Sequence, residues 1–436
     1  MQGTCKPDTR PCLIDMAGKR TGCETSDLVE EAATPCKNLR GNDEDIIFLN
    51  FPDKLCRRIA IRLGELCCSG QYTFSALQFL NCNGADETGG VPFSKAYCSI
   101  KPIGGKRKIF GSIFKNGLNL LSEFVEKRTI PQNRQEKFVL RKLLQYLTDK
   151  DAQAALKDLD KFEETHLTMV LANHLFGKLA TSSKYTIDKS CDGKVEKCPC
   201  RAQCQLTGNF GDTSIGNEEV WHGNLNIVVN NDVIVSRLVD DPQCPGGKSS
   251  EEAKTISSTS ILKRNPQIIA QSVVFSFLQK QTHPLSRHFM FPCIGIGSGG
   301  LVVYFYDSEH DVLLESTYIP LLVGPTSLED RYPSKLNLIT ILVSWFVVNY
   351  KYLCSGLPES LKTDGKANFF TQAKAKLDIY ENCLKAGNVG VSVFHHDTDS
   401  DVDSDSDADF FTEMQIKLIR LARKAKNAKE RNQEVD

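Results

Sequence analysis

The sequence predicts an α/β fold in which a mixed central sheet is flanked by helices. Apolar and β-branched residues form strand-like runs at 225–229 and 233–235, which predict two strands. Residues 230–232, Asn-Asn-Asp, tolerate positive φ angles, so a tight turn joins these strands into a hairpin. The hydrophobic period then changes to about 3.6 over residues 266–280, where apolar side chains cover most of a predicted helix. Such a helix must be buried, and the sheet that the hairpin starts is its natural partner.

Further strands of this sheet follow the helix in the sequence. Residues 290–296 and 301–306 are apolar, and residues 312–316 form a last short strand. The glycine-rich run at 295–300 lies between the first two of these strands. We expect it to form a hairpin turn, because a dinucleotide-binding fingerprint needs a helix to follow it.

Composition limits the class of protein. The chain has 436 residues, of which 41% are hydrophobic and 25% charged, as in soluble globular proteins with a large core. The formal net charge of -1 provides no overall field that would attract nucleic acid or an anionic membrane, so a nucleic-acid contact must be a local patch. The first residues lack the apolar run of a secretory signal. The 17 cysteines are irregularly spaced, which favours reduced thiols and an intracellular location, cytoplasmic or nuclear; a secreted, disulfide-rich region is the alternative.

The N-terminal third is predicted to lie outside the main domain. Residues 1–45 are polar and contain three prolines, which predicts a disordered arm. Residues 46–100 are predicted to form a small helical region, with helices at 53–67 and 72–81. This region is either an interaction module or a helical pad packed on the main domain. Residues 101–131 are predicted to be a linker, because two glycines and four basic residues open the segment.

The α/β domain is predicted to span residues 132–390. It begins with helices at 132–148, 152–162 and 166–181. His174 lies on the third helix, and a lone helical histidine is expected to be a packed or solvent-facing residue.

A cysteine-rich insert at residues 190–205 follows these helices. Cys191, Cys198, Cys200 and Cys204 have the spacing C-x6-C-x-C-x3-C. Four thiolates satisfy tetrahedral zinc, so a structural zinc site is one interpretation. Unligated thiols in an inserted loop are the alternative, because the spacing lacks two C-x2-C pairs.

The C-terminal part contains one long apolar helix and a charged tail. The helix at 335–353 is apolar for about 17 positions, which is short of the roughly 20 needed to cross a bilayer, so we expect a buried helix and no membrane span. Residues 391–411 are predicted to be an acidic, disordered segment, and residues 412–436 a basic amphipathic helix. This helix is predicted to contact a partner protein, a membrane surface, nucleic acid or its own acidic neighbour.

The hairpin region resembles the PD-(D/E)XK nuclease-like superfamily. The run Val220-x-x-Gly223-x-x-Asn226-Ile227-Val228 is similar to the apolar-x-x-Gly-x-x-Asp-apolar-apolar strand of that family. Gln267 and Gln271 resemble the glutamines of its RecB-like and lambda-exonuclease-like branches. The resemblance covers about residues 164–307. It implies an αβββαβ core made of the helix at 166–181, strands at 219–223, 224–229 and 233–238, the helix at 266–280 and a strand from 289.

The sequence departs from this family where the family performs its chemistry. The resemblance implies an aspartate on the second strand and an acid or glutamine on the third, both for Mg²⁺, with a lysine two residues later. The aligned residues here are Asn226, Val235 and Arg237. An amide and a valine are poor Mg²⁺ ligands, whereas an arginine suits phosphate.

We therefore expect a catalytically degenerate nuclease-fold protein that binds nucleic acid or has a regulatory role. An active Mg²⁺-dependent nuclease that uses Glu218 or Glu219 is one alternative, and a non-enzymatic interaction scaffold is another.

Overall fold

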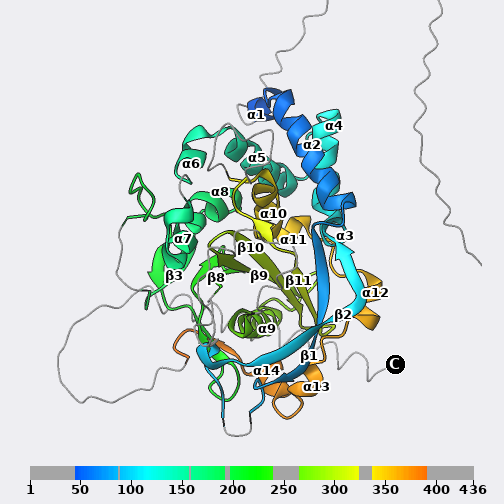
Figure 1. The fold of residues 1–436 in the computed structure, drawn as a ribbon, viewed down its shortest axis with the longest axis vertical. Coiled ribbons are helices and arrows are strands. Elements are labelled where there is room, and N and C mark those ends of the chain that lie inside the picture. The colour runs from blue at the N-terminus through cyan, green and yellow to red at the C-terminus, as the bar shows by residue number, and fades with distance from the viewer. Residues whose placement is uncertain are drawn as a thin grey trace, which may run out of the picture. The chain divides into compact units, whose positions relative to one another are not determined.

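A ten-stranded mixed sheet forms the centre of the protein (Figure 1). The computed structural model describes residues 45–86, 89–156, 159–191, 197–238, 265–323 and 336–389. The predicted arm, apart from its last residue, and the predicted segments 391–411 and 412–436 lie outside the described residues. The expected class, a mixed α/β fold with helices on a large mixed sheet, is confirmed.

The order of the strands shows how distant segments combine in this sheet. In the large sheet, β8 (Val233–Arg237) and β9 (Met290–Gly297) pair in parallel, as do β3 (Tyr185–Asp188) and β4 (Asn209–Gly211). The other neighbouring strands of this sheet are antiparallel. A separate three-stranded sheet has the order β13-β5-β6. From one edge to the other, the large sheet contains β2 (Cys98–Ile109), β1 (Thr73–Cys82), β11 (Val312–Ser316), β10 (Gly300–Asp307), β9 (Met290–Gly297), β8 (Val233–Arg237), β7 (Ile227–Val229), β3 (Tyr185–Asp188) and β4 (Asn209–Gly211), with β12 (Ile319–Pro320) beside β10; the small sheet contains β13 (Lys385–Ala386), β5 (Ser214–Gly216) and β6 (His222–Asn224).

Helices cover both faces of the large sheet (Figure 1). The faces can be identified from β8, because successive side chains of a strand point to opposite sides. Ser236 donates a hydrogen bond to Gln271 on α9 (Pro266–Thr282), whereas the next residue, Arg237, donates one to Thr165 on α7 (Glu164–Leu171). These two helices therefore lie on opposite faces of the sheet. The helices are α1 (Ile46–Leu49), α2 (Asp53–Cys68), α3 (Phe110–Ile113), α4 (Lys115–Lys127), α5 (Arg134–Thr148), α6 (Lys150–Ala154), α7 (Glu164–Leu171), α8 (Gly177–Leu179), α9 (Pro266–Thr282), α10 (Leu338–Val348), α11 (Tyr350–Leu353), α12 (Glu359–Asp364), α13 (Phe369–Gln372) and α14 (Leu377–Asn382), with 3₁₀ turns η2 (Phe93–Lys95) and η3 (Leu159–Lys161) and a π-helix η4 (Ala172–Phe176).

The predicted hairpin is confirmed as β7 and β8. Val229 pairs with Val233, and Ile227 pairs with Val235. Three residues, 230–232, connect the paired Val229 and Val233. Asn230 and Asn231 have φ angles of 55° and 61°, and the backbone N–H of Asp232 donates a 3.2 Å hydrogen bond to the carbonyl of Val229, as in a type I′ turn. The sequence Asn-Asn therefore fixes the register of the two strands.

The predicted helix after the hairpin is confirmed as α9. The side chain of Asn265 caps its first turn by accepting hydrogen bonds from the backbone N–H groups of Gln267 (3.0 Å) and Ile268 (3.4 Å). Residues 268–279 are all buried. α9 packs on β9 and β10 and links the parallel strands β8 and β9.

The apolar helix predicted at 335–353 is buried, as expected, but it is divided at Asn349 into α10 and α11. Every residue of α10 is buried, and the Trp345 indole donates a 2.8 Å hydrogen bond to the carbonyl of Val139 on α5. Among the described residues, no helix has both the length and the apolar character that crossing a membrane requires.

The predicted helix at 72–81 is wrong, because this segment is strand β1. Its register against β2 shifts between Ser75 and Leu77 and again between Phe79 and Asn81. Each shift interrupts the alternation of buried and exposed side chains. The apolar residues consequently acquire a spacing that resembles that of a helix.

The predicted linker at 101–131 is also wrong, because this stretch contains most of β2 and all of α3 and α4. β2 forms one edge of the sheet, and none of its residues is buried. Exposed edge strands commonly carry lysine and glycine, which oppose pairing with other chains. The region 46–100 is therefore not a separate helical region, because β1 joins it to the central sheet.

Two other predicted elements differ from the structure. Residues 152–162 contain only the end of α6 and the short turn η3 in place of a continuous helix. The predicted first strand of the nuclease-like core, 219–223, does not join the large sheet, because β6 belongs to the small sheet. β3 lies beside β7 in its place, antiparallel to it.

The turn of the hairpin provides a test of this local explanation. We expect Asn231→Val to lower the free energy of unfolding by about 1–2 kcal/mol, because a β-branched residue resists a positive φ angle. Asn231→Gly should leave this free energy almost unchanged, since glycine adopts the same angle without a steric penalty. Chemical denaturation of both variants measures the difference. Equal stability of the two variants would contradict the explanation.

Candidate functional site

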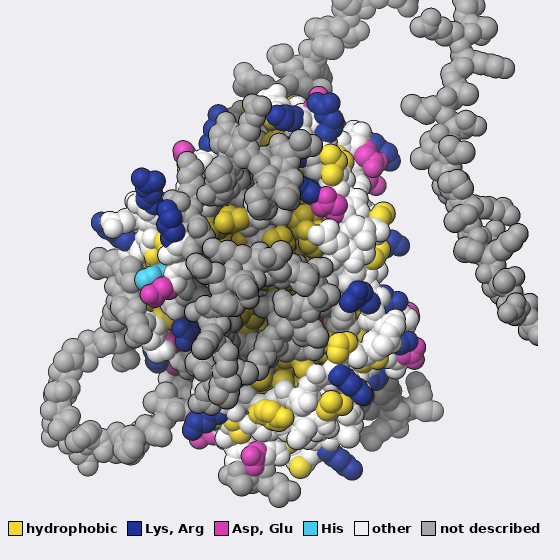
Figure 2. Space-filling view, in the orientation of Figure 1, with side chains coloured by type: hydrophobic (Ala, Val, Ile, Leu, Met, Phe, Trp, Pro, Cys, Tyr) yellow, Lys and Arg dark blue, Asp and Glu magenta, His cyan; other side chains and the backbone are white. Residues whose placement is uncertain are grey.

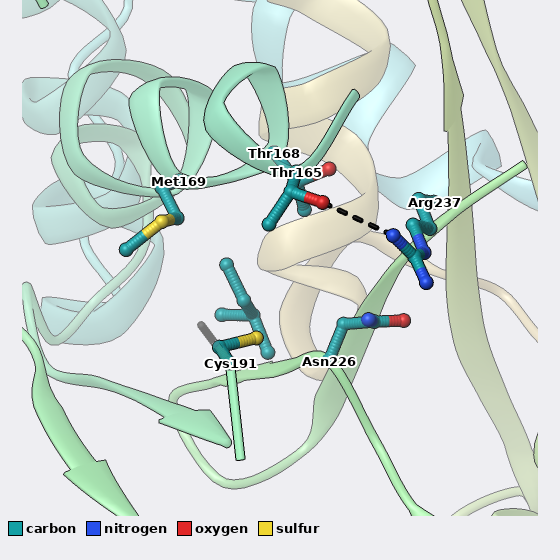
Figure 3. A pocket seen from close by; sticks show the side chains of 7 residues that line it. Thr165, Thr168, Met169, Cys191, Asn226 and Arg237 are labelled. Atoms are coloured by element: carbon teal, nitrogen blue, oxygen red, sulfur yellow. Dashed lines mark hydrogen bonds between the residues drawn. The ribbon is translucent and has the colours of Figure 1, made fainter. Parts of the chain in front are cut away.

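A small pocket lies between α7 and the ends of β7 and β8 (Figure 3). The enclosed part of the pocket has a volume of about 10 Å³, which is room for about one water molecule and far below the size of a cavity for a drug-sized ligand. Figure 3 shows side chains from the helix above and from the strands below converging on this space. The lining residues are Thr165, Thr168, Met169, Cys191, Asn226, Ile227 and Arg237.

Arg237 and Asn226 provide the polar groups on the strand side of this pocket. Arg237 donates a 3.1 Å hydrogen bond to the Thr165 hydroxyl and is exposed to solvent. The side-chain oxygen of Asn226 is buried and has no hydrogen-bond partner among the described residues. The pocket therefore combines an accessible cation with an unsatisfied acceptor, which suits an anionic group that also carries a hydrogen-bond donor or a bridging water.

The other residues aligned with the nuclease motif do not provide a metal site. Val235 is fully buried and pairs with Ile227 on β7 and Ile294 on β9. Glu218 and Glu219 are exposed in the turn before β6 and do not line the pocket. Within the part of the chain that the structure describes, no carboxylate is among the pocket residues. Mg²⁺ requires oxygen ligands, which this set lacks apart from neutral ones.

The resemblance also implies that Gly223, Gln267 and Gln271, together with Arg237, bind the ligand; Gly223 lies on β6 and the two glutamines lie on α9. Gln271 is fully buried; its side-chain oxygen accepts a 2.8 Å hydrogen bond from Ser236, and its side-chain amide donates one of 3.3 Å to the carbonyl of Asn224. Gln267 is half-buried in the first turn of α9. Gly223 has a φ angle of 133° and lies on β6, where an added Cβ would be 3.3 Å from the Phe93 ring. Gln271 thus has a structural role, because it connects α9 to Ser236 on β8 and to Asn224 on β6.

Asp188 is an important residue that the sequence analysis missed. It ends β3 and is 2% exposed. One carboxylate oxygen accepts hydrogen bonds from the backbone N–H and the hydroxyl of Ser190. The other accepts them from Thr213 (2.6 Å) and Asn224 (2.7 Å). Burial raises the pKa of Asp188, but these hydrogen bonds outweigh burial and hold the pKa below its ordinary value. Asp188 therefore connects the loop after β3, the segment before β5 and strand β6 through Ser190, Thr213 and Asn224.

We expect Asp188→Asn to lower the free energy of unfolding by about 2 kcal/mol at pH 7, because hydrogen bonds to the charged group are lost. The pKa of Asp188 is lower in the folded state, so its contribution is complete above about pH 4 and is lost as the pH falls through the folded pKa. The difference between variant and wild type should therefore shrink below pH 4. Denaturation at a series of pH values measures it.

Asp53→Asn is the matched control, because Asp53 pairs with Arg128 at the surface and is 85% exposed. It should change the unfolding free energy by less than about 1 kcal/mol. An Asp188→Asn difference that stays constant down to pH 2 would contradict the role given to the carboxylate.

A second cluster of chemically active side chains lies behind α7. The ligand atoms of His174, Cys198 and Cys200 all lie within 4.8 Å of one another, and all three residues are buried. The Cys198 sulfur is 3.4 Å from Nε2 of His174, and the sulfurs of Cys200 and Cys204 are 3.5 Å apart. This buried His/Cys/Cys group could hold a metal ion.

Of the four predicted cysteines, this group contains Cys198 and Cys200, and the sulfur of Cys204 lies next to that of Cys200. Cys191 lines the pocket beside Asn226 and is not part of the buried group. The expectation that His174 is an ordinary packed residue is also incomplete, since its ring nitrogen faces Cys198. The signal for His174 was a polar residue within an apolar helix, but sequence spacing did not connect it to cysteines more than twenty positions later.

The local structure of η4 and of the cysteine loop explains how His174 comes close to Cys198 and Cys200. His174 lies in the π-helix η4, an irregularity that is frequent at functional sites. Its neighbour Asn173 accepts hydrogen bonds from Tyr185 (2.9 Å) and from the backbone N–H of Thr207 (3.0 Å) and donates one to the carbonyl of Gln205 (3.3 Å). The cysteine loop is thereby attached to the helix.

The cysteine loop also closes on itself. The backbone N–H of Cys198 donates a 2.7 Å hydrogen bond to the carbonyl of Cys204, and that of Gln203 donates one of 2.8 Å to Cys200. Gln203 has a φ angle of 47°, which reverses the chain between the last two cysteines. These contacts are made by the backbone, so they do not depend on a bound ion.

The surroundings of the cluster affect its protonation. Burial lowers the pKa of His174, and the positive charge of Lys178 lowers it further, so the imidazole is neutral at pH 7. Burial raises the pKa of Cys198 to about 12. For Cys200, burial is outweighed by hydrogen bonds from Cys204 and Cys198, and the pKa lies below its ordinary value. A neutral imidazole is the form that binds metals. Burial also raises the pKa of Cys204, so Cys198 and Cys204 would have to release their protons when a metal binds.

Comparisons with protein-family models, with curated proteins and with solved structures found no match to this chain.

Proposed function

We propose that this chain is a catalytically degenerate PD-(D/E)XK nuclease-like protein that binds the phosphate backbone of nucleic acid and does not hydrolyse it. The main support is the pocket that contains Asn226 and Arg237, the residues aligned with the family's metal-binding aspartate and its lysine. Helix α7, strands β3, β7 and β8, helix α9 and strand β9 occur in this order along the chain, with β4, β5 and β6 inserted between β3 and β7. β3 here takes the place of the strand at 219–223 that the resemblance implies.

The substitutions in the pocket favour binding over chemistry. A guanidinium recognises phosphate oxygens through two parallel hydrogen bonds but stays protonated, so it cannot act as a base. Arg237 is exposed and held in place by Thr165, which orients it at the mouth of the pocket. Two Mg²⁺-binding carboxylates are replaced by a neutral amide and by a valine inside the apolar core.

A local contact is consistent with the charge distribution. Lys and Arg side chains are interspersed with Asp and Glu on the visible face of the molecule (Figure 2). The net charge is -1, so long-range attraction of a polyanion is weak. Binding should therefore involve few phosphates and have a shallow dependence on salt concentration.

The proposed location is intracellular. No disulfide joins the cysteines in the described residues, which fits a reducing compartment such as the cytoplasm or nucleus. Partner proteins of the C-terminal tail stay a prediction, because that segment lies outside the described residues.

We expect Arg237→Ala to weaken binding of a labelled oligonucleotide about fivefold, because one charge-assisted contact to phosphate is lost. The slope of log affinity against log salt concentration should fall in magnitude by about one. Fluorescence anisotropy with single- and double-stranded DNA and RNA measures both quantities.

Arg287→Ala is the matched control for this experiment. Arg287 is exposed in the loop before β9, whereas Arg237 pairs with Ile296 near the other end of that strand. The two variants lose the same charge at opposite ends of the sheet. Equal effects of both variants on affinity and on the salt slope would show that net charge, and not the pocket, determines binding.

We also expect the purified protein to leave DNA and RNA uncut in the presence of Mg²⁺ or Mn²⁺, because the pocket has no carboxylate to hold either ion. Gel electrophoresis of labelled substrates after long incubation tests this. Metal-dependent cleavage that disappears in Glu219→Gln would favour the alternative of an active Mg²⁺ nuclease that uses Glu218 or Glu219. If oligonucleotides do not bind, an interaction scaffold becomes the better proposal.

A further inference from the structure

We propose that His174, Cys198, Cys200 and Cys204 bind one structural zinc ion in a tetrahedral site, and that Cys191 is not a ligand. The site would lie between the π-helix η4 and the loop that connects β3 to β4. It is separate from the pocket, so the proposal does not depend on nucleic-acid binding.

The distances fit tetrahedral coordination. Zinc bonds of about 2.3 Å to sulfur and about 2.0 Å to nitrogen place neighbouring sulfurs about 3.8 Å apart and a sulfur about 3.5 Å from a nitrogen. The pair Cys200 and Cys204 is 3.5 Å apart, and Cys198 is 3.4 Å from Nε2 of His174. Small outward movements of His174, Cys198 and Cys200 would accommodate the ion. Cys204 lies next to Cys200 but outside the group whose ligand atoms are all within 4.8 Å of one another, so its side chain must turn toward the ion to become the fourth ligand.

The backbone already has the shape that such a site needs. The Asn173 side chain attaches the cysteine loop to the helix, and the hydrogen bond from Cys198 to Cys204 closes the loop. Cys198 and Cys204 are thus held at the two ends of a closed loop that contains Cys200. The fourth ligand, His174, comes from η4. Little conformational freedom is left to lose when the ion binds.

The chemistry of the ligands favours zinc over other metals. Three thiolates and one imidazole form a closed four-ligand set, which is the common composition of structural zinc sites. Hard ions such as Mg²⁺ and Ca²⁺ require oxygen ligands, and this set has none. Three thiolates leave the occupied site with one negative charge. Lys178 lies close enough to act electrostatically on both His174 and Cys204, and its positive charge offsets the negative charge of the occupied site.

The location in the fold assigns the ion a structural role. All four coordination positions are filled by the protein, so none is open for a substrate or a water molecule. Cys198 and Cys200 are 1% exposed, which keeps the ion away from solvent. Zinc would then fix residues 197–207 against η4 and stabilise this edge of the sheet.

Metal analysis of the full chain tests the proposal. We expect about one zinc ion per chain in protein produced with added zinc, and X-ray absorption should give a shell of three sulfurs and one nitrogen. A zinc chelator should lower the melting temperature by several degrees, and adding zinc back should restore it. Absence of zinc, or a disulfide between Cys200 and Cys204 in its place, would overturn the proposal.

Variants identify the ligands. Cys198→Ser and His174→Ala should lose most of the zinc, whereas the matched control Cys191→Ser should keep it. In cobalt-substituted protein, Cys204→Ser should lower the sulfur-to-metal charge-transfer absorbance by about a third, because three thiolates become two. A four-sulfur shell, or equal loss of zinc in Cys191→Ser and Cys198→Ser, would overturn the ligand assignment. The absorption spectrum of the wild type requires no variant, so misfolding of a variant cannot hide this result.

Discussion

The burial of α9 against β9 and β10 is the interaction on which the rest of the structure depends. Twelve consecutive residues of this helix are buried, and each large apolar side chain removed from water stabilises the fold by about 1.5–3 kcal/mol. Surface ion pairs such as Lys106 with Asp364 contribute about 0–1 kcal/mol each. At Gly295 on β9, an added Cβ would be 2.8 Å from the Leu238 side chain and 3.1 Å from that of Ile268 on α9, so these side chains would have to move. The helix thus fixes β8 beside β9, in parallel.

This parallel pairing determines which side chains can form the candidate pocket. Once β8 is fixed beside β9, alternation along the strand directs Ser236 toward α9 and Arg237 toward α7. The type I′ turn then sets the register of β7, which brings Asn226 to the same end of the sheet. A shift of one residue in this register would exchange the two faces of β7 and move Asn226 away from Arg237. The turn residues Asn230 and Asn231 are therefore far from the pocket but necessary for it.

Local patterns predicted the elements whose residues have one clear environment. The hairpin, α9 and the buried apolar helix have strong periods or turn residues, and their predicted positions are confirmed. β1 and β2 were missed for opposite reasons. Bulges in β1 produced a helix-like spacing, and β2 is polar because it is an exposed edge. Asp188 was missed because its importance depends on Ser190, Thr213 and Asn224, which lie 2, 25 and 36 positions away. Local sequence contains no sign of such contacts.

The group of His174, Cys198 and Cys200 was also not predicted as a unit from local sequence, for a different physical reason. Each residue of an α-helix turns by about 100°, so a helical projection from sequence places every side chain by its number alone. The π-helix at residues 172–176 adds an extra residue to one turn and rotates everything after it relative to that projection. His174 lies inside this irregular turn and faces Cys198. Cysteine spacing gave a metal site as one of two interpretations, because spacing alone does not show which side chains meet. The three-dimensional arrangement brings His174 to Cys198 and Cys200 and leaves Cys191 beside the pocket, so the ligand set depends on contacts between η4 and a loop more than twenty positions later.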